Sequence, residues 1–139
     1  MKKILVAIDG SAPSLHAARV ALEIATGLNA ALTLCYSVPP IMMPGEVPFT
    51  VVSDVVKAEA ENGKVLLGQA LKELGGGGKI ATVVLEGPPA ERIDQVAEEE
   101  GFDLVVVGSR GRNAVARLFL GSVADRIVHI SKKPVLVVR

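Results

Sequence analysis

Five short aliphatic runs, spread along the whole chain, constrain its fold more than any other feature. They occupy residues 4–8, 31–38, 80–85, 104–107 and 134–138. The first run is rich in β-branched residues and lacks the apolar–polar alternation of a half-exposed strand. That pattern is typical of strands covered on both faces. We therefore expect five strands in a buried sheet.

The stretches between these runs carry apolar residues at helical spacing. The predicted helices cover residues 12–28, 51–74, 89–97 and 123–131. Ser11 is suited to cap the first helix, with Pro13 in its first turn. Gly63 and Gly68 weaken the second helix moderately. The tetraglycine 75–78 ends that helix, and because it follows a helix rather than a strand we interpret it as a connector, not a nucleotide loop.

The alternation of strands and helices predicts an α/β fold: a doubly wound, five-stranded parallel sheet with helices on both faces. A chain of 139 residues without an internal repeat or a dividing linker is expected to form one domain, residues 1–139.

The composition argues against several classes of protein. Fifteen basic and fifteen acidic residues give zero formal net charge, and aromatic residues make up 3% of the chain, which is a poor basis for binding nucleic acid. The first apolar run stops at Asp9, too early for a signal peptide, and no run has the length of a membrane span. The single cysteine excludes an internal disulfide and fits a reducing compartment. We expect a cytoplasmic protein that binds neither nucleic acid nor a membrane.

The connection before the last helix, residues 108–122, is unusual in length and charge. Strand-to-helix turns in α/β units usually take about two to six residues. No acidic residue lies between Asp103 and Asp125, whereas three arginines do: Arg110, Arg112 and Arg117. The glycines leave room for a ligand, and Gly121 and Ser122 stand where a helix N-terminus offers free N–H groups and a positive dipole end. The segment predicts an anion site.

Three features follow or end the predicted strands and are expected to meet. In an open doubly wound sheet, ligands bind at the carboxyl ends of the strands, where the winding reverses direction. If the first strand is central and the fourth lies beside it, Asp9 and Gly108 flank one crevice, and Val38 forms its far wall. A nucleotide suits this site, with its phosphates at the loop and Ser122, its base at Val38, and its ribose or a metal at Asp9.

Each part of this site also has a purely structural interpretation. Asp9 can cap the first helix or close a turn, and the arginines can form a solvated face. Gly108 and Gly111 can relieve a tight turn, and Ser122 is a good N-cap with or without a phosphate. We favour the functional interpretation because these residues meet at one predicted crevice.

Several nucleotide-related motifs are missing from the chain. A Walker A loop requires a lysine before Ser122, where this chain has Gly121, and the Rossmann glycine pattern does not follow the first strand. A receiver domain of the same architecture requires an acidic pair, an aspartate and a lysine at three strand ends. The chain has Asp9 alone, then Glu86, and no lysine after Pro134.

The glycine spacing nevertheless resembles a known signature. The pattern Gly108-x2-Gly111-x9-Gly121-Ser122 resembles the ATP-binding signature of the universal stress protein family, and residues 4–11, 86–93 and 133–138 resemble other parts of that family. The resemblance covers essentially the whole chain, in order. It implies the strand order 3-2-1-4-5, a homodimer joined through the last strand, and ATP binding without strong intrinsic hydrolysis.

The resemblance also implies roles for individual residues. It places Ala7 and Asp9 near ribose and adenine, Val38 at adenine through its backbone, Gly108, Ser109, Arg110 and Gly111 around the ribose and phosphates, and Gly121, Ser122, Val123 and Ala124 at the phosphates. Some family members carry Mg²⁺ or Mn²⁺ on the triphosphate, so any metal is expected to enter with ATP rather than to be held by the protein alone, and Asp9 is the candidate protein contact for it.

A dimer is also expected from the residues themselves. Residues 135–138 form an apolar C-terminal strand at a sheet edge, and an uncovered edge invites pairing.

Three functions remain in competition. The leading one is a regulatory, ATP-binding stress protein whose nucleotide changes its protein partners. The second is a slow ATPase or nucleotide hydrolase that uses Asp9 with a metal, although no residue of the predicted site is an evident general base. The third is a dimeric interaction module without nucleotide, which the intact glycines disfavour.

Overall fold

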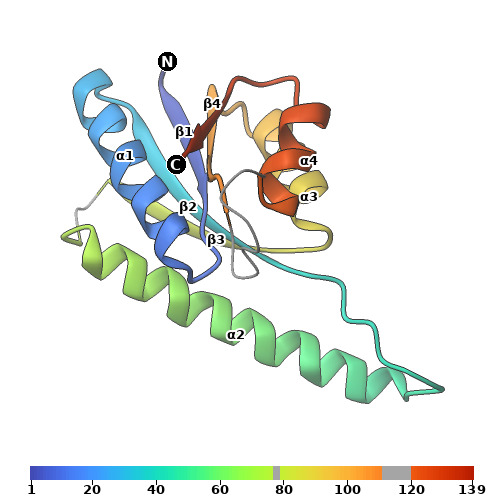
Figure 1. The fold of residues 1–139 in the computed structure, drawn as a ribbon. Helices are drawn as coiled ribbons and strands as arrows, with labels where there is room; N and C mark the ends of the chain where they lie inside the picture. Colours follow the sequence, from blue (N-terminus) through green and yellow to red (C-terminus); the bar gives the residue numbers. More distant parts are fainter. Residues whose placement is uncertain (77–78, 111–119) are drawn as a thin grey trace.

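The computed structural model describes residues 1–76, 79–110 and 120–139 (Figure 1). Strands and helices alternate along the chain, as the sequence predicts. The elements are β1 (Lys3–Ala7), α1 (Ala12–Leu28), β2 (Ala31–Val38), α2 (Phe49–Glu73), β3 (Ile80–Glu86), α3 (Pro89–Glu99), β4 (Leu104–Gly108), α4 (Ser122–Ile130) and β5 (Val135–Val138).

The five strands form one parallel sheet in the order β3-β2-β1-β4-β5. This confirms the predicted fold class and the strand order that the family resemblance implies. The first strand lies at the centre, where Val6 pairs with Leu34 of β2 on one side and with Val106 of β4 on the other. Ile4, Leu5 and Val6 have no exposed surface, which explains why the run shows no alternation of apolar and polar residues.

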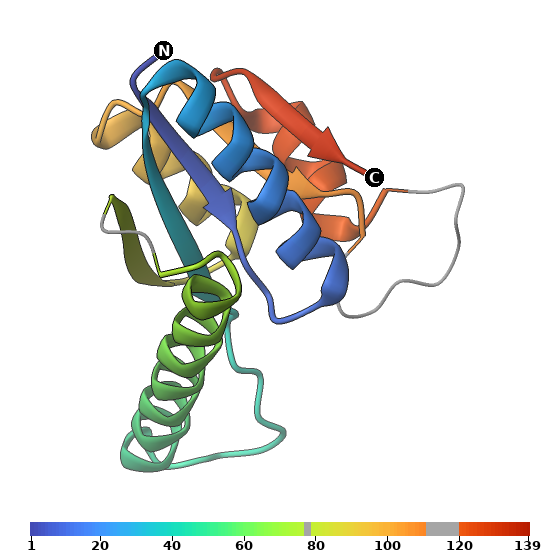
Figure 2. The same ribbon diagram turned by 90° about the vertical axis from the view of Figure 1, so that its left-hand side faces the viewer.

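Helices cover both faces of the sheet (Figures 1 and 2). One core contains Ile4 and Val6 of β1 together with residues of α1 and α2. The other contains Leu5 of β1 with residues of α3 and α4. Successive residues of the central strand therefore enter opposite cores, as the two-residue period of a strand requires.

The first helix begins as the sequence predicts. Ser11 is its N-cap, and the Ser11 side chain accepts a hydrogen bond of 3.2 Å from the backbone N–H of Ser14. Pro13 lies in the first turn, where its missing N–H costs no helical hydrogen bond. The buried stripe of α1 consists mainly of alanines, which bring the helix close to the sheet: Ala17, Ala18, Ala21 and Ala25.

Two predicted helix starts are wrong by one or two residues. The second helix begins at Phe49 rather than at residue 51, directly after Pro48. The last helix begins at Ser122, so Gly121 is its N-cap and Ser122 is not. Gly121 has extended backbone angles and no side chain to signal a cap, which is why the sequence favoured the neighbouring serine. Of the predicted connector, Gly75 and Gly76 follow α2 with positive φ, and residues 77–78 lie outside the described part.

The second helix extends beyond the sheet (Figures 1 and 2). Its fully buried residues, Gly63, Leu67 and Ala70, all lie in its C-terminal half. Its N-terminal half and the Pro-rich segment 39–48 before it project past the ends of the strands. Phe49 at the start of the helix is 83% exposed.

Within the described residues, none of the helices combines the length and the apolar character that crossing a membrane requires.

Candidate functional site

The strand ends that were expected to flank one crevice are neighbours in the sheet. β1 ends at Ala7, and its partner β4 ends at Gly108. Val38 ends β2 on the other side of β1. The carboxyl ends of all three strands point to the same edge because the sheet is parallel. The predicted meeting of Asp9, Gly108 and Val38 at this edge therefore rests on observed topology.

Asp9 organises the turn between β1 and α1. Its Oδ1 accepts a hydrogen bond of 2.9 Å from the backbone N–H of Ser11, and its own N–H donates to Ser14 Oγ at 3.3 Å. Gly10, between Asp9 and Ser11, has a φ of +84°, which a glycine adopts without strain. These hydrogen bonds show that Asp9 closes the turn between β1 and α1. Asp9 remains partly exposed.

The two ends of the long connection are joined by backbone hydrogen bonds. The N–H of Gly121 donates to the carbonyl of Ser109 at 2.6 Å, and the N–H of Ser109 donates to the carbonyl of Val138 at 2.7 Å. The end of β4, the end of β5 and the start of α4 therefore meet at one point. Arg110 is half-buried beside it. Gly111, Arg112 and Arg117 lie outside the described residues.

The N-terminus of α4 presents backbone N–H groups at this point. Among the described residues no side chain caps the helix, and the N–H groups of a first helical turn have no partner within the helix. Asp125 is the acidic residue of the first turn of α4. Its Oδ1 lies 4.0 Å from Nδ1 of His129, which is one turn further along the helix. Ala124 is buried and Val123 packs against the core. Those two residues offer backbone N–H groups, not side chains, to a ligand.

Gly108 has a packing role that sequence reasoning missed. A Cβ at this position would lie 3.1 Å from both the carbonyl carbon and the carbonyl oxygen of Pro13, and 3.3 Å from the carbonyl oxygen of Arg110. The first turn of α1 therefore approaches β4 closely at Gly108. The same turn is held by Asp9 through Ser11, so Asp9 and Gly108 share one structural neighbour.

Val38 is attached to the β3–α3 turn. Its carbonyl accepts a hydrogen bond of 3.0 Å from the N–H of Gly87, and Ser37 Oγ donates to the Gly87 carbonyl at 3.2 Å. Gly87 has a φ of +127°. Sequence reasoning did not connect Gly87 to Val38, although a glycine followed by Pro88 and Pro89 is a turn signal.

Metal-ligating and nucleophilic groups are sparse among the described residues. No group of three or more His, Cys, Asp or Glu side chains is placed to hold a metal ion there. Burial raises the pKa of the Cys35 thiol to about 12, so the thiol stays protonated at neutral pH. His129 lies in the last turn of α4, away from Gly121 at the other end of that helix.

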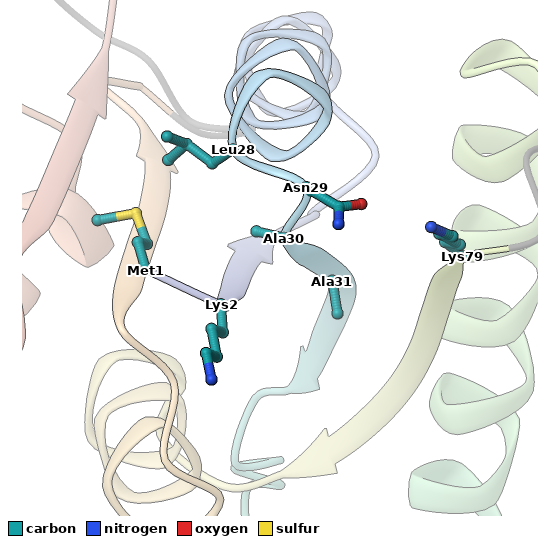
Figure 3. A pocket seen from close by; sticks show the side chains of 7 residues that line it. All are labelled: Met1, Lys2, Leu28, Asn29, Ala30, Ala31 and Lys79. Atoms are coloured by element: carbon teal, nitrogen blue, oxygen red, sulfur yellow. The ribbon is translucent and has the colours of Figure 1, made fainter.

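A shallow pocket of about 690 Å³ lies at the opposite edge of the sheet, near the amino ends of β1 and β2 (Figure 3). It contains none of the predicted site residues. Its lining consists of Met1, Lys2, Leu28, Asn29, Ala30, Ala31 and Lys79. Figure 3 shows Met1 and Leu28 on one side and Lys79 on the other, so the two lysines do not converge on one point.

Beside this pocket, Asp103 attaches the start of the chain to the turn before β4. Its Oδ2 accepts hydrogen bonds from the backbone N–H groups of Lys2 and Lys3, at 2.7 and 3.0 Å. These bonds hold the pKa of the Asp103 carboxyl below its usual value. A lowered folded-state pKa gives stability that is present above the unfolded-state pKa of about 3.9 and is lost as the pH falls below it.

We therefore expect Asp103→Asn to lower the free energy of unfolding at pH 7, and the gap from wild type to narrow as the pH falls from about 5 to 3. Urea unfolding across that range measures this gap. A gap that stays constant with pH would mean that the carboxylate charge of Asp103 does not contribute.

Comparison with known proteins gives one consistent result. The model of the universal stress protein family matches residues 1–139. A universal stress protein of Methanocaldococcus jannaschii is 37% identical over 141 residues, covering 99% of this chain and 82% of that protein. The solved structure of universal stress protein UspA from Lactobacillus plantarum has a TM-score of 0.87 at 28% identity, covering 99% of this chain and 97% of that one. A crystal structure of a universal stress protein in complex with cAMP has a TM-score of 0.74 at 29% identity, covering 99% and 97% of the respective chains.

Proposed function

The chain belongs to the universal stress protein family, and we propose from this premise that it binds ATP at the carboxyl edge of β1, β2 and β4. The nucleotide acts as a ligand or switch that alters the protein's association with other proteins, rather than as a substrate that is turned over rapidly.

One observation carries the proposal: the hydrogen bond from Gly121 N–H to the Ser109 carbonyl. It brings the N-terminus of α4, which no described side chain caps, to the end of β4, beside β1 and its Asp9. A helix N-terminus at the carboxyl edge of a parallel sheet favours phosphate through its free N–H groups and its dipole. The similar protein solved with cAMP carries a ligand of the same adenine nucleotide class.

The proposed contacts divide the nucleotide among the elements. The N–H groups of Ser122, Val123 and Ala124 bind phosphate, and the half-buried Arg110 neutralises its charge. Residues 108–111 surround the ribose and phosphates, with Ala7 and Asp9 next to ribose and adenine. The Val38 carbonyl accepts one hydrogen bond from Gly87 and keeps a second lone pair for the adenine amino group. Mg²⁺ or Mn²⁺ enters on the triphosphate.

Assembly through the last strand is part of the proposal. β5 pairs with β4 on one side and ends the order of the sheet on the other. Its residues Val135 to Val137 are only half-buried. An apolar edge of this kind pairs readily with the same edge of a second copy. Light scattering that gives the monomer mass at every concentration would contradict this dimer.

The decisive test identifies the molecule that leaves the freshly purified protein on denaturation, by chromatography with mass detection. ATP in near-stoichiometric amount supports a tight site with slow turnover. Recovery of ADP or AMP, together with metal-dependent turnover that Asp9→Asn abolishes, would favour the slow hydrolase. An empty protein that also fails to bind added ATP with Mg²⁺ would leave the nucleotide-free interaction module.

The variant Gly121→Val tests the phosphate site directly. Gly121 has φ −62° and ψ 160°, which valine adopts, so we expect the fold to persist with a loss of about 1 kcal/mol at the cap. The side chain occupies the space in front of the first N–H groups, and ATP affinity should fall at least about tenfold. Gly27→Val is the matched control, because nothing lies within 4 Å of a Cβ there. Unchanged ATP affinity in Gly121→Val would refute the site.

A further inference from the structure

The side of α2 that faces away from the sheet is uncovered along much of the helix. In Figures 1 and 2, α2 lies along one margin of the molecule, and the described elements lie on its other side. The residues of the outward side are exposed from Val51, at 42%, to Val65, at 56%. We call this surface the outer face of α2 and define it by Val51, Asp54, Lys57, Ala58, Glu61, Asn62, Lys64, Val65 and Gln69, all of them exposed.

A row of alternating charges follows one flank of the outer face. Asp54, Lys57, Glu61 and Lys64 are spaced by three or four residues, so they lie in one line along the helix. Their signs run negative, positive, negative, positive. Within the chain, Lys64 Nζ lies 3.0 Å from Glu61 Oε1, and both side chains are well exposed, at 63% and 71%. The row therefore points into solvent and is open to a second set of charges.

A row of small and apolar residues lies beside the charged row. Val51, Ala58 and Val65 are seven residues apart, which places them two turns from one another on the same side of the helix. Ala58 stands midway between the valines and lets a second helix approach closely. The opposite flank, with Asn62 and Gln69, also contains Glu59 and Glu73. These two carboxylates are engaged within the chain, by Tyr36 and Arg19 respectively. An apolar seam with charges along it is typical of a helix that pairs with another helix.

We propose that the outer face of α2 is an interface between two copies of this chain, with the two α2 helices packed antiparallel about a two-fold axis that passes between the levels of Ala58 and Glu59. In this arrangement Val51 faces the partner's Val65, and Ala58 faces the partner's Ala58. The charged flanks of the two helices lie on the same side of the pair. Lys57 then lies beside the partner's Glu61, and Asp54 beside the partner's Lys64.

The charge pattern is what selects a second copy as the occupant. The charge pairs 54–64 and 57–61 are both centred at position 59, whereas the apolar pairs 51–65 and 58–58 are centred at position 58. An axis between these two positions brings the members of every pair to within one residue's rise of each other, about 1.5 Å along the helix. The two-fold axis repeats them, which gives four ion pairs, and Lys57 lies closer along the helix to the partner's Glu61 than to the partner's Lys57. The row contains two cations and two anions, so it has no net charge that would attract a membrane or a nucleic acid. A two-fold interface must be complementary to itself, and this row satisfies that requirement.

This interface is separate from the proposed β5 dimer and from the nucleotide site. The fully buried residues of α2 face its own sheet, and none of them belongs to the outer face. With both interfaces formed, the chain assembles beyond a dimer as concentration rises. With the α2 interface alone, it forms a dimer. In either case, loss of the α2 interface lowers the limiting mass by a factor of at least two.

Charge exchange provides the test. The variant Lys57→Glu/Lys64→Glu makes the row entirely acidic, and Asp54→Lys/Glu61→Lys makes it entirely basic. Each variant alone should show at most half the limiting mass of wild type in light scattering, because like charges then face each other. An equimolar mixture should regain the wild-type mass, since the acidic row of one copy then faces the basic row of the other. Wild-type mass in each variant alone, or no recovery on mixing, would overturn the proposal.

A cysteine next to the proposed axis gives an independent measurement. Ala58→Cys should form a disulfide-linked dimer rapidly under mild oxidation, because the two residues face each other next to the axis. The native Cys35 is 1% exposed and does not compete. Gly27→Cys on α1, also exposed and with open space around its Cβ, is the matched control and should cross-link much more slowly. Equal rates for the two variants would overturn the α2 interface even if the chain is dimeric.

Discussion

Replacing Gly63 by alanine is expected to destabilise the protein by about 2–3 kcal/mol, whereas the same change at Gly68 should stabilise it by about 0.5–1 kcal/mol. Both glycines lie inside α2, five residues apart, so helix propensity alone predicts the same gain for both. The opposite signs arise from what each Cβ would meet. At Gly63 it would overlap atoms of the Tyr36 ring, and at Gly68 nothing lies within 4 Å.

The Tyr36 ring cannot easily move away from a new methyl group at Gly63. Tyr36 is 3% exposed, within the core between the sheet and α2, and its hydroxyl donates a hydrogen bond of 3.0 Å to Glu59 Oε2. Alanine at 63 therefore has to lift α2 or rotate the ring out of its hydrogen bond. Urea unfolding of both variants, at a protein concentration low enough to avoid assembly, measures the two free energies. A stabilised Gly63→Ala would show that α2 packs loosely on Tyr36.

This pair of glycines also shows what the sequence does not reveal. From the pattern alone, Gly63 and Gly68 both count as weak positions in a helix. A close approach between a strand residue and a helix residue that are 27 positions apart leaves no local signature. The fold class, in contrast, follows from the local pattern, because buried strands and amphipathic helices each have their own period.

The order of the strands is a different kind of information. The five aliphatic runs are alike in composition and do not specify which run pairs with which. The order β3-β2-β1-β4-β5 was therefore predicted from the family resemblance alone, and the observed strand pairing confirms it. Once that order holds, the proximity of Asp9 and Gly108 follows from topology.

The part of the candidate site that the sequence missed consists of backbone contacts. The bond between Gly121 N–H and the Ser109 carbonyl, and the bond between Gly87 N–H and the Val38 carbonyl, use groups that every residue except proline possesses. Side-chain roles with a local signature, such as the Ser11 cap, were predicted correctly. The loop between these ends, with Gly111, Arg112 and Arg117, lies outside the described residues, so its predicted contacts stay predictions.

Gly108→Ala is expected to lower the free energy of unfolding by about 1–3 kcal/mol in protein freed of nucleotide. The Cβ would meet the carbonyl group of Pro13 at 3.1 Å and the carbonyl oxygen of Arg110 at 3.3 Å. These are backbone atoms, so no side-chain rotation relieves the contact. Relief requires α1 to shift from β4, and Asp9 and Ser11 hold the same turn of α1 through their hydrogen bond.

The same variant separates two reasons for a glycine at the end of β4. If Gly108 serves the packing of α1 on the sheet, Gly108→Ala unfolds at a lower urea concentration than wild type in the absence of ligand. The control Gly27→Ala, on α1, has open space around its Cβ and should unfold at the wild-type urea concentration. If the glycine serves only a nucleotide, unfolding without ligand is unchanged and ATP affinity alone falls. A fall in both means that packing and binding share Gly108, because the turn that contacts it is also the turn that positions Asp9.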